Sequence, residues 1–244
     1  MRLSKFSLIW LLLVSGLAMT CSIVMAESKL TGTTGKGVAG SGKGGISNDS
    51  GKGQAKLPSI PVGLKTETAI FAGGCFWCTE FAFEQVDGVL DVQSGYCGGT
   101  KATANYDQVH LGTTGHAEAI RVIYDPEKVT YDELLTIFFD AHDPTQLNRQ
   151  GEGDIGRQYR SAIFYTNDEQ LKQAKAKIAD LEAKKAFKRR IVTKLESLKE
   201  FYPAEDYHQD FARRNPFLPY IQSHAVPKAM QVRTKHPDLI RSGE

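Results

Sequence analysis

The chain has 244 residues, of which 41% are hydrophobic and 24% are charged, a composition typical of a globular protein with one domain or two small ones. Its 30 Lys and Arg residues are nearly balanced by 28 Asp and Glu residues, which gives a formal net charge of +2. This balance excludes the strongly basic surface of a nucleic-acid-binding protein and indicates no charged partner.

The N-terminus has the pattern of an export signal. Arg2 and Lys5 precede an apolar run over residues 6–25, and Ala26 provides a small residue after which a signal peptidase can cut. The run also approaches the length needed to span a bilayer, so an uncleaved membrane anchor is the alternative. Residues 1–26 are therefore predicted to be a signal peptide or an anchor, and the rest of the chain is predicted to be extracytoplasmic, either periplasmic or secreted.

A change of composition separates this segment from the folded part. Residues 27–56 are rich in Gly, Ser, Thr and Lys and contain almost no residue that could help to build a core, which predicts a flexible linker. The folded domain is expected over residues 57–235, and residues 236–244 are expected to be a C-terminal tail.

The first half of the domain alternates strand and helix patterns. A short apolar run is ended by Gly73 and Gly74, which indicates a strand followed by a tight turn. In chain order the predicted elements are a strand over 68–72, a helix that starts near Cys75, a strand over 89–95, a loop over 96–115 and a strand over 117–124.

In the second half, Thr130 and Glu133 have the spacing of a capping box and predict a helix that ends near His142. The elements predicted after it are a polar loop over 143–160, a strand over 161–165, a helix from Asn167 to about Lys185, a strand over 191–198 and a short helix over 204–214. Interspersed strands and helices favour a sheet packed by helices in a single α/β or α+β domain.

Three cysteines lie outside the signal segment, at Cys75, Cys78 and Cys97. A structural zinc site normally needs four ligands, and the chain has no second CxxC, so no metal site is expected. An odd number of thiols also fits poorly with a purely structural disulfide framework in an exported protein. A reactive role for the cysteines is the better interpretation, because a helix N-terminus is expected to lower the pKa of Cys75 and to populate its thiolate near neutral pH. Cys78 lies one turn further on and would be the natural disulfide partner of Cys75.

Two classes of thiol enzyme use such a pair. A thioredoxin-like oxidoreductase has CxxC after a strand, usually with small or turn-forming residues between the cysteines. Here Phe76 and Trp77 occupy the gap. Two aromatic residues would more often belong to a core, but beside a nucleophile they predict an apolar wall and a pocket for a small apolar group.

The sequence around these residues resembles a known family, peptide methionine sulfoxide reductase A. The blocks that carry the resemblance stand in the family's order and are GCFWCTE (74–80), GYCGG (95–99), TGHAEA (114–119), YDP (124–126), HDPTQLNRQG (142–151), GRQYRSAIFY (156–165) and FYPAEDYHQDF (201–211). The similarity covers residues 68–220, essentially the whole predicted domain. Several long blocks in order are far more specific than a single CxxC.

The resemblance implies an α/β (α+β) two-layer sandwich, in which a ferredoxin-like mixed sheet is packed by helices and loop content is substantial. It implies reduction of the S epimer of methionine sulfoxide, free or in peptides and proteins, and hence repair of oxidised exported proteins. The enzyme would hold no bound cofactor and would take electrons from an external thioredoxin-like dithiol. We expect a monomer that binds no nucleic acid, tethered to the membrane if the signal is not cleaved.

By the same resemblance, Cys75 would be the nucleophile that attacks the sulfoxide sulfur, releases methionine and is left as a sulfenic acid. Phe76 and Trp77 would hold the S-methyl group of the substrate. Glu118 would donate the proton that the sulfoxide oxygen needs. A Glu in a strand pattern usually faces solvent, so this role requires Glu118 to be buried, where desolvation raises its pKa.

The resemblance also implies that Tyr106 and Tyr159 offer hydroxyl hydrogen bonds to that oxygen and that Asp154 helps to organise the site. The segment RQGEGDIGRQY carries one residue more than the usual spacing, which leaves the register of Asp154 open. The remaining candidate bases are His116, His142 and His208, for which structural hydrogen bonding is at least as good an interpretation.

The chain departs from the family pattern in its second thiol. Many relatives regenerate the nucleophile with cysteines near the C-terminus, but this chain has none after Cys97. Either Cys78 or Cys97 must then resolve the sulfenic acid, unless an external thiol does so. A disulfide between Cys75 and Cys78 is favoured, and Cys97, in a glycine-containing loop expected to move, is the alternative or a relay that takes the disulfide onward.

Two other classes of function are compatible with the same residues. A general thiol–disulfide oxidoreductase would use the CxxC pair to reduce protein disulfides, and a tethered binding module would capture oxidised methionine without turnover. For the reductase, an oxidising compartment does not reduce the catalytic disulfide unaided. We therefore expect a thioredoxin-like partner that receives electrons across the membrane.

Overall fold

The computed structural model describes residue 60 and residues 63–242 of the chain. The predicted signal segment and linker lie outside the described residues. Among the residues that are described, no helix combines the length and the apolar character needed to cross a membrane.

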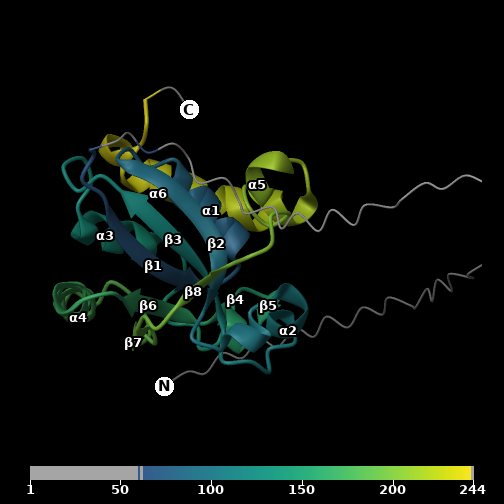
Figure 1. Ribbon diagram of the computed structural model, residues 1–244. Helices are drawn as coiled ribbons and strands as arrows, with labels where there is room; N and C mark the ends of the chain where they lie inside the picture. Colours follow the sequence, from purple (N-terminus) through teal and green to yellow (C-terminus); the bar gives the residue numbers. More distant parts are fainter. Residues whose placement is uncertain (1–59, 61–62, 243–244) are drawn as a thin grey trace, which may run out of the picture. The chain divides into compact units, whose positions relative to one another are not determined.

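A mixed sheet forms the centre of the described domain (Figure 1). Its six strands lie in the order β7-β6-β1-β3-β2-β8, and every neighbouring pair is antiparallel except β6 and β7, which are parallel. The strands are β1 (Glu67–Gly73), β2 (Val89–Cys97), β3 (Ala117–Tyr124), β6 (Ser161–Tyr165), β7 (Lys194–Ser197) and β8 (Phe201–Pro203). A separate short ladder joins β4 (Arg149–Gln150) to β5 (Asp154–Ile155).

The helices pack mainly on one face of this sheet. They are α1 (Phe76–Glu84), α2 (Tyr106–His110), α3 (Tyr131–Ala141), α4 (Asp168–Ala183), α5 (Phe211–Arg214) and α6 (Val226–Lys235). Shorter helical turns are η1 (Lys101–Thr103), η2 (Arg157–Tyr159), the π-helical η3 (Ile221–Ala225) and η4 (Pro237–Leu239). The predicted mixed α/β fold, a sheet packed by helices, is confirmed.

The alternation of side chains along β1 shows how the sheet divides the core. Ala69 and Phe71 point to the helical side, where they belong to the main cluster with side chains of α1, α3 and α6. Ile70 and Ala72 point to the other face, into a smaller cluster rich in alanine that is covered by Leu198 and Phe201. Successive residues of a strand face opposite sides, so both faces of β1 are buried and the strand is apolar throughout.

The turn between β1 and α1 fixes where the helix begins. Gly74 has φ of +96°, a conformation that residues with a Cβ rarely adopt. A side chain at this position would also run into the buried side chain of Gln150. Cys75 follows as the N-cap residue, and its carbonyl accepts hydrogen bonds from the N–H groups of Cys78 (3.1 Å) and Thr79 (3.3 Å).

Replacing Gly74 with Ala is therefore expected to destabilise the domain by about 1–3 kcal/mol, because strain and a collision add at one position. Urea unfolding followed by circular dichroism measures the change. Gly153→Ala is the matched control, since a Cβ on Gly153 meets no atom within 4 Å. Equal midpoints for the two variants would contradict this account of the turn.

Most of the predicted elements are confirmed. The strands expected over 68–72, 117–124 and 161–165 are present, and the Thr130–Glu133 capping box forms with both of its hydrogen bonds. The side chain of Asn167 caps α4 by accepting from the N–H of Gln170. Polar capping residues and short apolar runs therefore located these elements correctly.

The segment expected to be a loop over 96–115 is wrong in part, since β2 continues to Cys97 and the segment also holds η1 and α2. The strand expected over 191–198 is shorter, at Lys194–Ser197. The helix expected over 204–214 is reduced to α5. The side chain of Gln209 instead bonds to both the N–H and the carbonyl of Ser94 on β2, and these bonds hold the preceding residues in turns.

The C-terminal part is more ordered than the sequence suggested. Helix α6 was not predicted, although Pro227 stands at its start, where a proline fits the first turn. Beyond it, Ile240 bridges to Val86, and the N–H of Arg241 donates to the carbonyl of Gln85 (3.0 Å). The packed domain thus extends past residue 235, into the segment assigned to a tail.

Candidate active site

A cavity of about 170 Å³ opens beside the N-terminus of α1. The residues that line it are Cys75, Phe76, Trp77, Tyr106, Glu118, Asp154, Tyr159 and Tyr220. They come from α1 and its N-cap residue, α2, β3, β5, η2 and the residue before η3, so the fold gathers them from distant parts of the chain. The structure thus brings together the predicted nucleophile, aromatic wall, acid and hydroxyl donors, and adds Tyr220, which the sequence analysis did not name.

Glu118 lies on β3 and points towards the start of α1. Its side chain is buried, and its Oε2 accepts a hydrogen bond from the N–H of Phe76 at 3.0 Å. Burial raises the pKa of Glu118 to about 8, against the opposing effect of that hydrogen bond. The carboxyl group is therefore mainly protonated at neutral pH and can donate a proton into the cavity.

The two predicted hydroxyl donors are held by their local structure. The N–H of Tyr106 donates to Glu205 Oε1 at 2.9 Å, and α2 is capped by the side chain of Asn105. Tyr159 ends η2, where its N–H donates to the carbonyl of Gly156 at 3.0 Å. Burial raises the pKa of both tyrosines, so their hydroxyls remain protonated donors.

The structure places Asp154 at the cavity despite the additional residue in its segment. The β4–β5 ladder pairs Asp154 with Gln150, and Gly151 takes a φ of +75° in the turn between them. Both carboxylate oxygens accept from the hydroxyl of Tyr220, at 2.9 and 3.0 Å. Burial raises the pKa of Asp154, while the Tyr220 hydrogen bond acts in the opposite direction.

The electrostatics of Cys75 differ from the expectation. Cys75 is 5% exposed, its thiol is free, and it hydrogen-bonds with Cys78. Burial raises the pKa of Cys75 well above its usual range, and Cys78, Glu118 and Asp154 raise it further. The prediction that the helix N-terminus lowers this pKa is wrong for the free site, because desolvation and two nearby carboxyl groups outweigh the helix dipole. The hydrogen bond between Cys75 and Cys78 lowers the pKa of Cys78.

Cys97 is placed away from this cavity. It is the last residue of β2, fully buried, and pairs with Ala117 on one side and Phe201 on the other. Its side chain belongs to the cluster on the far face of the sheet, whereas Tyr96 packs towards Phe76 with ring centroids 5.8 Å apart. The expectation that Cys97 sits in a movable loop is wrong, because strands on both sides hold it.

A comparison with known families identifies the family to which this chain belongs. The sequence pattern described as peptide methionine sulfoxide reductase matches residues 67–239. The chain belongs to the peptide methionine sulfoxide reductase family.

Curated members of this reductase family are similar over most of their length. The peptide methionine sulfoxide reductase MsrA 2 of Synechocystis sp. is 56% identical over 178 residues, which cover 72% of this chain and 83% of that protein. The MsrA of Pasteurella multocida is 48% identical over 174 residues, which cover 71% of this chain and 98% of that protein.

Solved structures of the family share the fold. Mxr1 from Saccharomyces cerevisiae in reduced form matches with a TM-score of 0.61 and 35% identity, over 66% of this chain and 91% of that one. Methionine sulfoxide reductase A of Corynebacterium diphtheriae matches with a TM-score of 0.57 and 34% identity, over 68% and 84% of the two chains. The mixed sheet with its helices is therefore the fold of the methionine sulfoxide reductases.

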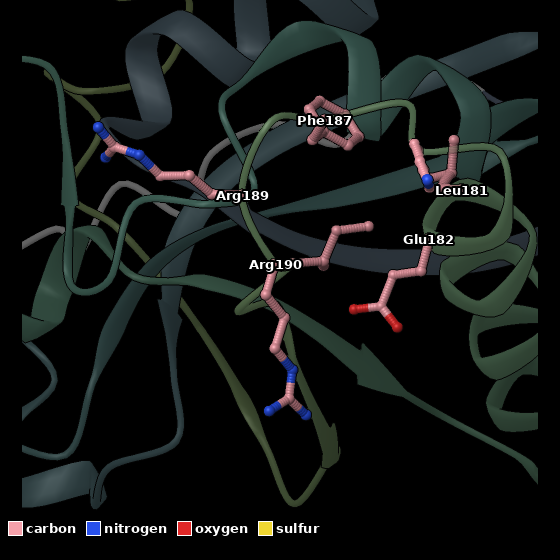
Figure 2. Close-up of a pocket in the computed structure, with 7 residues that line it drawn as sticks. Leu181, Glu182, Phe187, Arg189 and Arg190 are labelled. Carbon is pink, nitrogen blue, oxygen red and sulfur yellow. The ribbon is translucent and has the colours of Figure 1, made fainter.

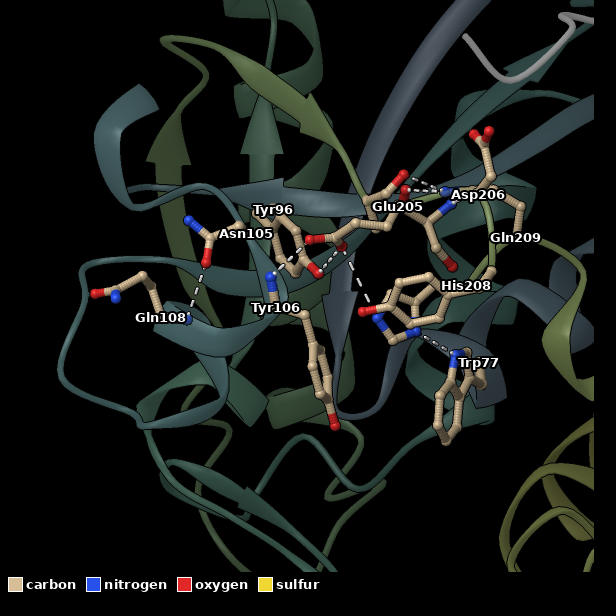
Figure 3. Close-up of polar contacts among 12 residues, drawn as sticks. Trp77, Tyr96, Asn105, Tyr106, Gln108, Glu205, Asp206, His208 and Gln209 are labelled. Carbon is tan, nitrogen blue, oxygen red and sulfur yellow. Dashed lines mark hydrogen bonds and ion pairs between the residues drawn. The ribbon is translucent and has the colours of Figure 1, made fainter. Parts of the chain in front are cut away.

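A hydrogen-bond network lies behind the aromatic wall of the reductase site (Figure 3), and in it His208 has the structural role that the sequence analysis gave as one interpretation. The indole N–H of Trp77 donates to Nδ1 of His208 at 3.1 Å, and the indole ring stacks on Phe211 at a centroid distance of 3.8 Å. The carboxylate of Glu205 accepts hydrogen bonds from the hydroxyl of Tyr96 (2.9 Å) and from the N–H of Tyr106. His208 and Glu205 both lie in the FYPAEDYHQDF block. This block was therefore the sequence feature that could have indicated the network.

A larger cavity elsewhere in the described domain lacks the thiol that sulfoxide reduction needs (Figure 2). It measures about 430 Å³ and lies between the end of α4 and the segment that leads to β7. Its lining combines Glu182, Arg189 and Arg190 with a few apolar side chains and includes no thiol. Within the described range, no group of three or more His, Cys, Asp or Glu side chains could hold a metal ion. The cavity at Cys75 is therefore the candidate active site.

Proposed function

We propose that this chain reduces the S epimer of methionine sulfoxide, free or in peptides and proteins, to methionine. The single observation that carries this proposal is the shared cavity of the Cys75 thiol and a Glu118 carboxyl group that is protonated at neutral pH. A sulfoxide needs a nucleophile at sulfur and a proton at oxygen, and these two groups supply both.

In the first half-reaction the oxygen atom passes from the substrate to Cys75. Glu118 donates a proton to the sulfoxide oxygen as the sulfur of Cys75 attacks the sulfoxide sulfur, and the thiol proton returns to the Glu118 carboxylate. The hydroxyl then moves from the substrate sulfur to the sulfur of Cys75 as the bond between the two sulfurs breaks and methionine leaves. The sulfoxide is reduced by two electrons to methionine, and the thiol is oxidised to a sulfenic acid. No proton is gained or lost overall.

The walls of the cavity explain how one epimer can be selected. Phe76 and Trp77 offer an apolar surface for the S-methyl group, whereas Tyr106 and Tyr159 place hydroxyls for the oxygen. Cys75 fixes the direction of attack. When the methyl group, the oxygen and the direction of attack are all fixed around a pyramidal sulfur, only one of the two epimers fits the site. The family resemblance favours the S epimer.

In the second half-reaction we propose that Cys78 attacks the sulfenic acid and forms a disulfide with Cys75. The hydrogen bond between the two thiols supports this pairing, as does the position of Cys75 as N-cap residue, outside the regular helix. Cys97 remains the alternative, but its place on the far face of the sheet requires β2 to leave β3 or β8 first.

Alanine at the two candidate resolving positions should separate these routes. Cys78→Ala is expected to release one methionine per chain and then to lose at least about tenfold in turnover with a protein dithiol. Cys97→Ala is expected to keep turnover within about twofold, since it removes a small side chain from a distant cluster. Steady-state methionine release measures both; a larger loss in Cys97→Ala would assign the resolving role to Cys97.

We further propose that a thioredoxin-like dithiol regenerates the enzyme and that the protein acts outside the cytoplasm as a monomer. The predicted export signal supports this location, and an uncleaved signal would add a membrane tether. In that compartment the partner must receive its electrons across the membrane. The mass of the protein recovered from the extracytoplasmic fraction tests both the location and the cleavage after Ala26.

The experiment that tests the function is methionine release by the purified chain from each sulfoxide epimer, with a dithiol reductant. Catalytic release from the S epimer alone supports the proposal. The competing general oxidoreductase would reduce insulin disulfides without any sulfoxide. A binding module would capture the sulfoxide and release no methionine.

A further inference from the structure

We propose that Tyr220 and Asp154 form a proton relay that activates Cys78 for its attack on the Cys75 sulfenic acid. This inference rests on the proposed function and assigns a catalytic role to Tyr220, because its hydroxyl touches the sulfur that reacts.

The three groups form a continuous chain of hydrogen bonds. The thiol of Cys78 donates to Oη of Tyr220 at 4.0 Å, at the long end of the range for a sulfur donor. The Tyr220 hydroxyl in turn donates to the carboxylate of Asp154, with Oη 2.9 Å from Oδ1 and 3.0 Å from Oδ2. A proton can therefore leave the thiol for the phenol oxygen as the phenol proton moves to the carboxylate.

Cys78 needs such a path because it has no contact with solvent. It is 0% exposed, so bulk water cannot take its proton, and only the thiolate is an effective nucleophile. Its other sulfur contact is Cys75, which is the electrophile once it carries the oxygen. Burial raises the pKa of Tyr220, which keeps the phenol neutral and able to pass a proton on.

The step balances without a further reactant. Cys78 transfers its proton through Tyr220 to Asp154, and the resulting thiolate forms a bond to the sulfur of Cys75. The S–O bond of the sulfenic acid breaks, and the departing oxygen takes the proton from Asp154 and leaves as water. Asp154 and Cys75 line the same cavity, so the water forms where the relay ends. The thiol sulfur of Cys78 is thereby joined to the sulfenic acid sulfur of Cys75, and the earlier oxidation of Cys75 by the sulfoxide supplies the two oxidising equivalents of the disulfide. Tyr220 and Asp154 end the step with the protons they had at its start.

The packing of Tyr220 does not depend on its hydroxyl. Its ring stacks on His224 at a centroid distance of 4.4 Å with an interplanar angle of 12°, and it meets Trp77 edge-on at 6.1 Å. Tyr220→Phe keeps these contacts and removes only the oxygen. A role limited to packing would leave this variant unchanged, or would disturb both half-reactions alike.

The test is a single-turnover experiment on the full chain with S-epimer methionine sulfoxide, followed by rapid quenching. Tyr220→Phe is expected to slow disulfide formation at least about tenfold more than it slows release of the first methionine. Its sulfenic acid should accumulate and be trapped by dimedone. Asp154→Asn should also slow disulfide formation, which provides a second variant if the first folds poorly.

Two controls separate the relay from general effects. In a Cys78→Ala background, Tyr220→Phe should not change the lifetime of the sulfenic acid, because the thiol served by the relay is absent. Tyr202→Phe removes another hydroxyl, one bonded to Glu200 at the surface, and should change neither half-reaction. Unchanged disulfide formation in Tyr220→Phe, or an equal slowing of both steps, would overturn the relay. Failure of the wild-type chain to release methionine would instead overturn the proposed function.

Discussion

Replacing Cys75 with Ser is expected to abolish methionine release from the S epimer, with a loss of about 10³-fold or more, to the limit of detection. The two side chains are close in size, and the serine would stand between the same aromatic wall and Glu118. A hydroxyl is a far weaker nucleophile than a thiol, however, and it cannot accept the sulfoxide oxygen as a sulfenic acid does. The nucleophile, and not the shape of the cavity, is what the substitution removes.

Cys78→Ser is the matched control, since it alters a thiol one turn further along the same helix. This variant should still release one methionine per chain in the first turnover, because Cys75 is retained. Urea unfolding of both variants checks that each is folded. Release of methionine by Cys75→Ser at a rate comparable to the wild type would contradict the assignment of the nucleophile.

Glu118→Gln is expected to slow the first half-reaction by about 10²–10³-fold. Glutamine has the same shape and can still accept the hydrogen bond from the N–H of Phe76, but it has no proton to give to the sulfoxide oxygen. The pKa of about 8 sets the pH dependence. The acid form of Glu118 predominates below this pH, so the rate in the wild type should fall as the pH rises through about 8.

Rapid-quench measurement of the methionine burst against pH tests this prediction. The fall above about pH 8 should be absent from Glu118→Gln, whose remaining pH dependence reports the Cys75 thiol. Glu169→Gln, an exposed position on α4, should leave the burst and its pH profile unchanged. A wild-type burst that does not fall above this pH, or a normal burst in Glu118→Gln, would contradict the role of Glu118 as the acid.

Local patterns explain which features could be predicted from the sequence. The apolar run of β1 and the Gly74 turn place Cys75 before a helix, and the capping residues of α3 and α4 fix where these helices start. Of the residues that line the cavity, Cys75, Phe76, Trp77, Glu118 and Tyr159 lie in motif blocks that resemble the family. Helix α1 begins where it was predicted, directly after Cys75.

Long-range contacts explain what the sequence did not reveal. The pKa of Cys75 depends on its burial and on carboxyl groups contributed by β3 and β5, and neither is visible in the residues near the cysteine. Cys97 is held in a strand because β8, only three residues long, pairs with it. The bond between Tyr220 and Asp154 spans 66 positions of the chain. Such pairings arise from the fold and leave no short sequence pattern.

The most direct test of the account is the position of the oxygen after one turnover. Cys78→Ala should be reacted with S-epimer methionine sulfoxide in the absence of reductant, treated with dimedone, digested and analysed by mass spectrometry. The account predicts a sulfenic acid adduct on Cys75, in equal amount to the methionine released, and an unmodified Cys97. Methionine released without oxidation of Cys75, or an adduct on another residue, would contradict it.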